Sequence, residues 1–75
     1  MPPSEAEVRR VMRQIDGLDP ARPEDLQLVL WVLANSGLQF AEMKQALLRW
    51  LDRAGLKLEL WMVKYLEAVP RPLRR

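Results

Sequence analysis

Three glycine–leucine pairs divide this chain into four short segments, and this punctuation limits the fold more than any other feature of the sequence. The pairs are Gly17-Leu18, Gly37-Leu38 and Gly55-Leu56. Each pair follows a stretch whose apolar residues recur at the three- and four-residue spacing of a helix face. Glycine commonly follows the last residue of a helix, and the next apolar residue packs back on the last turn. The sequence therefore predicts four helices joined by short loops.

The first two segments carry start signals as well as stop signals. Ser4 and Glu7 form a Ser-x-x-Glu capping box, which predicts a first helix over about residues 4–16. Pro23 suits the first turn of a helix because proline has no N–H to leave unpaired there. A second helix is therefore predicted over about residues 23–36.

The last two segments differ in how clearly their apolar spacing indicates a helix. A narrow apolar stripe predicts a third helix over about residues 39–54. Residues 56–60 alternate like a strand, whereas the longer stretch 58–69 follows helical spacing. We therefore expect a fourth helix over about residues 57–69, ended by a proline and followed by a basic tail.

These elements predict an all-α, compact four-helix single domain over residues 1–75, because a chain of this length holds one domain at most. Short loops make sequential helices pack as mostly antiparallel neighbours. The second helix is the most apolar and is expected to be the most central. The expected core consists of Val8, Val11, Met12, Ile15, Val29, Leu30, Leu33, Phe40, Met43, Leu47, Trp50, Leu51, Trp61 and Tyr65.

The composition argues against catalysis. The chain contains neither cysteine nor histidine, so thiol nucleophiles and the commonest general base and metal ligand are missing. Ser4 and Ser36 fit helix ends, and the isolated glycines do not form a phosphate-binding loop. We therefore expect no enzymatic activity, no cofactor, no metal site and no small-molecule substrate.

The carboxylate pairs have a structural explanation. Asp16 with Asp19, and Glu24 with Asp25, lie at helix ends, where acidic side chains cap backbone N–H groups and oppose the helix dipole. A metal site in this loop would lack the alternating acidic spacing of a calcium loop. The N-terminus has no signal-peptide pattern, and no apolar run approaches the length of a membrane span, so a cytoplasmic location is expected.

Trp31 lies on the polar side of its own helix. At about 100° per residue, it falls opposite the aliphatic arc of that helix, among Glu24, Gln27 and Asn35. A large aromatic side chain there requires a second packing layer or a binding partner. The aliphatic arc contains Leu26, Leu28, Val29, Leu30, Val32 and Leu33.

Three further apolar residues, Leu48, Leu60 and Val63, lie outside the apolar stripes of their helices. Together with Trp31, they are core residues if other helices cover the second helix on all sides, or else they form an exposed binding patch. Arginines on the outer face of the first helix would give that patch a charged rim. We expect a non-catalytic protein–protein interaction module, such as an adaptor, an inhibitor or a regulatory subunit of a larger complex, that binds another protein or a second copy of itself. The expected contact residues are Trp31, Leu48, Leu60, Val63, Arg9 and Arg13.

Nucleic-acid binding is the alternative, although a net charge of +2 is small for this function. The second and third helices resemble a helix-turn-helix in outline, with Gln39, Ala41, Lys44, Gln45 and Leu48 on the would-be recognition face. The arginines available to contact phosphates are Arg9, Arg10, Arg13, Arg71, Arg74 and Arg75.

Overall fold

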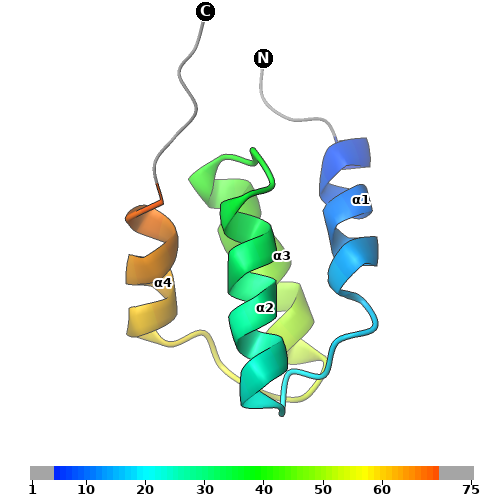
Figure 1. The fold of residues 1–75 in the computed structure, drawn as a ribbon, viewed down its shortest axis with the longest axis vertical. Helices are drawn as coiled ribbons and strands as arrows, with labels where there is room; N and C mark the ends of the chain where they lie inside the picture. The colour runs from blue at the N-terminus through cyan, green and yellow to red at the C-terminus, as the bar shows by residue number, and fades with distance from the viewer. Residues whose placement is uncertain (1–4, 70–75) are drawn as a thin grey trace, which may run out of the picture.

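The computed structural model describes residues 5–69, and within this range it contains four helices and no strand (Figure 1). Successive helices alternate in direction, so α1 and α3 run one way and α2 and α4 run the other. The all-α, four-helix prediction is therefore confirmed. None of the helices in the described range has both the length and the apolar character needed to cross a bilayer. The helices are α1 (Glu5–Ile15), α2 (Pro23–Ala34), α3 (Phe40–Asp52) and α4 (Leu60–Glu67).

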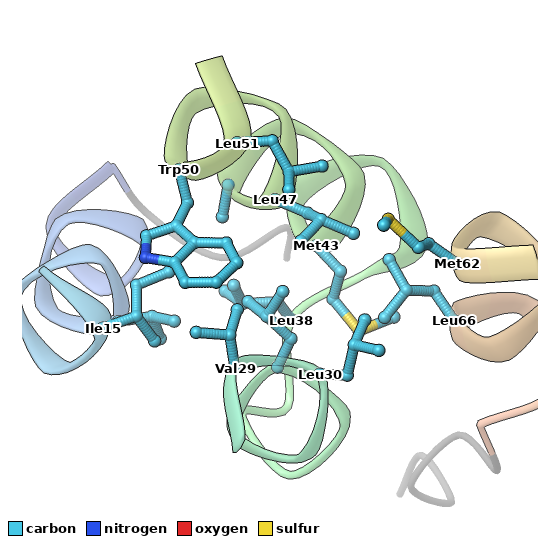
Figure 2. Close-up of a cluster of buried hydrophobic side chains, with 13 residues drawn as sticks. Ile15, Val29, Leu30, Leu38, Met43, Leu47, Trp50, Leu51, Met62 and Leu66 are labelled. Atoms are coloured by element: carbon cyan, nitrogen blue, oxygen red, sulfur yellow. The ribbon is translucent and has the colours of Figure 1, made fainter. Parts of the chain in front are cut away.

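The helices α2 and α3 share the centre of the molecule. Each of them contacts the other three helices, whereas α1 and α4 do not contact one another. Figure 2 looks into the core and shows α2 and α3 facing each other, with α1 and α4 on either side. The prediction that α2 is the most central helix is therefore wrong, because α3 shares this position, and α2 keeps an outward face that the other described helices leave uncovered.

Thirteen buried apolar side chains fill the space between the helices, and five of them come from α3. The core predicted for the first three helices is largely confirmed, with Val8, Met12 and Phe40 partly buried at its edge. Leu38 and Ala46 are additional core residues that the stripes did not single out. The buried residues are Val11, Ile15, Val29, Leu30, Leu33, Leu38, Met43, Ala46, Leu47, Trp50, Leu51, Met62 and Leu66.

Helix α4 turns a different face inward from the one expected. The placement of Trp61 and Tyr65 in the core is wrong, because they are 43% and 40% exposed, whereas Met62 and Leu66 are buried. Trp61 Nε1 donates to Glu59 Oε1 at 2.9 Å. An indole N–H and a phenol O–H need polar partners or water, and both are accessible at the surface. Met62 and Leu66 have no such requirement and take the interior positions.

Helix α4 also begins later than predicted. Residues 56–59 form neither helix nor strand, so the helix starts at Leu60 instead of residue 57. This segment must carry the chain from the end of α3 to the start of α4, and an extended residue covers about 3.3 Å compared with 1.5 Å in a helix. The other helix bounds agree with prediction within one or two residues. Ser4 of the predicted capping box and the tail over 70–75 lie outside the described residues.

Two of the three glycines end their helices as predicted. Gly37 and Gly55 have φ angles of 78° and 70°. At the end of α3, the Leu56 N–H donates to Leu51 O and the Gly55 N–H to Asp52 O, both at 3.0 Å. These two bonds define a Schellman motif, which satisfies carbonyl groups that the helix end would otherwise leave unpaired.

Gly17 does not adopt this left-handed conformation, so the prediction of three equivalent helix ends is wrong there. The Leu18 N–H donates instead to Ile15 O at 3.1 Å in a tighter turn. The carbonyl of Leu18 accepts a hydrogen bond from Trp50 Nε1 at 3.1 Å. This bond from α3 fixes the turn through a tertiary contact that local sequence does not encode.

Candidate functional site

Helix α2 carries large apolar side chains on both of its faces. On the inner face, Val29, Leu30 and Leu33 are at most 1% exposed, and Figure 2 shows the first two pointing into the core. On the outer face, Trp31 is 60% exposed and Leu28 is 45% exposed. The sequence placed Trp31 opposite the aliphatic arc and left open whether a second packing layer covers it, and the structure shows it exposed. Leu28 belongs to the aliphatic arc but is also exposed, because the surrounding helices cover a narrower arc of α2 than its aliphatic residues span.

Four exposed residues form a row along this uncovered face, here called the α2 outer row. They are Glu24, Leu28, Trp31 and Asn35, separated by four, three and four residues. Alternating steps of three and four keep side chains on one side of a helix. Leu28 and Trp31 therefore lie one helical turn apart and form a single apolar area with a polar residue at each end.

A hollow of about 300 Å³ adjoins Trp31 between α1 and α2. Arg10 and Gln14 line it from α1, and Trp31 and Asn35 line it from α2. The Asn35 side chain donates from Nδ2 to Trp31 O at 2.8 Å, which holds the amide at the end of α2. The hollow therefore brings Arg10 and two amide-bearing residues, Gln14 and Asn35, to the same surface region as the exposed Trp31. Its complete lining is Arg10, Val11, Gln14, Trp31, Val32, Asn35 and Ser36.

The arginines of α1 lie in different surroundings. Arg9 makes an ion pair with Glu5 at 3.8 Å, in which both side chains are mostly exposed. Arg13 is exposed and does not line the hollow. Arg10, which the sequence assigned only to the nucleic-acid alternative, does line it and makes no ion pair with any described residue. The rim charge beside Trp31 is therefore Arg10.

The other predicted apolar contact residues do not line the hollow beside Trp31. Leu48 lines a second hollow of about 500 Å³ with Leu56 and Leu58, at the end of α3 and in the linker that follows. Leu60 is 69% exposed at the first residue of α4, and Val63 is half-buried. The two hollows share no residue, so Leu48 belongs to a different hollow from Trp31.

A third hollow of about 460 Å³ lies between the ends of α2 and α4, and Tyr65, Ala68 and Val69 form its α4 side. Because Trp61 and Tyr65 were predicted to be core residues, neither aromatic side chain was expected at the surface, and of the two Tyr65 lines this hollow. The signal available in the sequence was Glu59, which is close enough along the chain to accept a hydrogen bond from the Trp61 indole.

The carboxylates near the first loop are engaged in the fold. The Asp19 N–H donates to Asp25 Oδ2 and the Ala21 N–H donates to Asp19 Oδ1, both at 2.9 Å, so these carboxylates stabilise the loop. The predicted capping of a helix end is not found at α2, whose N-cap residue Arg22 makes no side-chain capping bond. Asp16 instead accepts from Arg53 Nη1 at 2.6 Å, and its backbone oxygen accepts from the same atom at 3.0 Å. Within residues 5–69, no group of three or more acidic side chains is placed to hold a metal ion.

The structure describes only some of the residues proposed for nucleic-acid binding. Arg71, Arg74 and Arg75 lie outside the described residues. Helices α2 and α3 lie side by side in opposite directions (Figures 1 and 2). The two helices of a helix-turn-helix instead meet at about 90–120°. The arrangement therefore does not favour the helix-turn-helix interpretation.

Comparison with known proteins adds no family to this description. No family model matches the chain, no curated protein is significantly similar to it, and no solved structure matches it.

Proposed function

We propose that this chain is a small, non-catalytic, all-helical protein–protein interaction module whose contact surface is the α2 outer row with Arg10 at its edge. The observation that carries the proposal is the 60% exposure of Trp31 directly beside Leu28, which is 45% exposed. The inner face of the same helix is buried, so these two side chains are not needed to complete the core. An adaptor, an inhibitor and a regulatory subunit all work through such a surface.

The chemistry of the surface defines what it can bind. Burying an aromatic side chain removes about 150–250 Å² from water, and tryptophan and arginine are the residue types most enriched at energetically dominant contacts. A partner would place an apolar side chain against Trp31 and Leu28. It would also bring a carboxylate to Arg10, because charge complementarity at the rim fixes orientation and speeds association.

The matched test uses two exposed apolar residues on different surfaces. Tagged wild-type chain, Trp31→Ala and Leu48→Ala are expressed in the source cells, and the proteins that copurify are quantified by mass spectrometry after crosslinking. We expect at least one protein that the wild type and Leu48→Ala retain and that Trp31→Ala loses. If all three chains retain the same proteins in the same amounts, the α2 outer row is not the contact surface.

Nucleic-acid binding is tested in parallel with a fluorescent random duplex. Micromolar binding that weakens steeply with salt and with Arg9→Ala and Arg13→Ala would replace the proposal by the alternative function. The cytoplasmic location expected from the sequence remains a prediction, and imaging of a fluorescent fusion tests it.

A further inference from the structure

The α2 outer row has the spacing and symmetry of a helix-packing seam. Its residues are four, three and four positions apart, which is the alternation by which two helices pack along each other. The row is also symmetric about its middle, because Leu28 and Trp31 form the centre and the polar residues Glu24 and Asn35 form the ends. A row of this kind is complementary to itself when a second copy runs in the opposite direction.

An antiparallel pair of α2 helices gives each residue of the row a suitable neighbour. With a twofold axis between positions 28 and 31, Leu28 of one copy meets Trp31 of the second copy, and Glu24 meets Asn35 of the second copy. The apolar residues then cover each other twice, and each Glu24 carboxylate faces an amide donor. A parallel pair would place Glu24 against Glu24, where like charges repel.

The charges beside the row favour the same orientation. Arg10 lines the hollow that contains Asn35, so its guanidinium lies near the end of the row opposite Glu24. Among residues 5–69, Glu24 makes an ion pair with Arg22 alone, at 3.6 Å, and both side chains of that pair are more than 60% exposed. Antiparallel packing would bring Glu24 of each copy toward Arg10 of the other, which creates two equivalent attractive pairs.

We infer that the α2 outer row binds a second copy of this chain and forms an antiparallel homodimer. This inference rests on the proposed function, since it names an occupant for the same surface. Figures 1 and 2 show that no other helix covers the outward side of α2. A 12-residue helix is about 18 Å long, so the contact belongs at the small end of specific interfaces and the dimer is expected to be weak.

The first test measures oligomeric state by sedimentation equilibrium on the full 75-residue chain, from about 1 μM to 1 mM, which spans weak dimer affinities. The wild type is expected to shift from monomer to dimer within this range. Trp31→Ala should raise the dimer Kd at least about 30-fold, because the symmetric contact loses two tryptophan anchors. Leu48→Ala is the matched control, since Leu48 is 38% exposed and lies outside the row, and it should leave the Kd unchanged.

The second test is a charge exchange that probes the antiparallel register. Arg10→Glu alone and Glu24→Arg alone should each raise the dimer Kd about tenfold, since two attractive pairs become repulsive. The double variant should return to within about threefold of the wild type, because it restores both pairs with their signs reversed. Lys44→Glu, which changes an exposed charge on α3, should have no effect.

The outcomes separate this inference from the proposed function. A wild type that remains monomeric up to 1 mM, about the weak limit of specific association, overturns the homodimer and leaves the capture experiment to decide the function. A dimer that Trp31→Ala leaves intact contradicts this inference, because another surface then joins the two copies, and the capture experiment again decides the proposed function. A dimer that needs Trp31 but is not restored by the double charge exchange contradicts the antiparallel register. Circular dichroism on every variant excludes unfolding as the cause of lost association.

Discussion

Two tryptophans of this molecule lie in opposite surroundings. The comparison distinguishes apolar surface that is buried on folding from apolar surface that stays exposed. Trp50 is fully buried between α3 and its neighbours, and its indole N–H donates to Leu18 O. Trp31 is 60% exposed on the outer side of α2, next to exposed Leu28. Folding therefore uses the whole apolar surface of one indole, whereas the apolar surface of the other remains available for binding.

The largest expected effect on stability comes from the buried tryptophan. Trp50→Ala should lower the free energy of unfolding by about 3–5 kcal/mol, because it leaves a large cavity and an unpaired Leu18 carbonyl. That loss is comparable to the whole stability of a marginal domain. Urea denaturation followed by circular dichroism measures it. Trp61→Ala is the control, and a similar loss there would contradict the exposure assigned to Trp61.

The next largest effect on stability is expected at Leu66, on the face of α4 that points into the core. Leu66→Ala should cost about 2–5 kcal/mol, because Leu66 is fully buried. Tyr65→Ala should cost much less, because Tyr65 is 40% exposed at the edge of the same helix. Thermal melts of the two variants compare these positions directly. The reverse order would restore the sequence-based orientation of α4, with the aromatic residues inside.

Gly55 and Gly17 differ in backbone conformation, and we expect their replacement by alanine to have different effects on stability. Gly55→Ala should cost about 1 kcal/mol, since φ is +70° there and the cost is purely conformational in open space. Gly17→Ala should be neutral or stabilising by up to about 1 kcal/mol, because Gly17 lacks a positive φ and a Cβ would meet nothing within 4 Å. Equal destabilisation at both positions would show that the two turns are alike.

A smaller effect is expected for the ion pair between the α1 and α3 ends. Arg53→Ala should lower the free energy of unfolding by at most about 1 kcal/mol, since both partners are about half exposed or more and water screens the charges. The effect should shrink as salt is added. Arg9→Ala should change nothing measurable, because its pair with Glu5 is longer and more exposed. Melts at low and high salt test both variants, and a larger loss for Arg9→Ala would reverse this order.

Local patterns predicted the helices well because spacing, prolines and glycines act within a few residues. They placed Trp31 opposite the aliphatic arc for the same reason, since that depends only on the turn of its own helix, but they left open whether another layer would cover it. They did not predict that Leu28 would be exposed, because that depends on how wide an arc of α2 the other helices cover. Sequence spacing also could not show that Arg10 approaches Trp31, which results from the packing of α1 on α2.

Helix α4 shows a second kind of limit. Its apolar residues span more than one face, so the pattern permits several rotations of the helix. The choice between Trp61 with Tyr65 and Met62 with Leu66 depends on where polar atoms find partners. That information lies in the tertiary environment and in Glu59, outside the apolar stripe.

The free energy of unfolding of Trp31→Ala tests whether the outer face of α2 is separate from the core, when it is measured by urea denaturation at a concentration where the wild type sediments as a monomer. We expect a value within about 0.5 kcal/mol of the wild type, because truncating an exposed side chain removes no core contact. A loss of about 2 kcal/mol or more would place Trp31 in the folded core. It would then contradict the claim that the outer face of α2 is a surface reserved for binding.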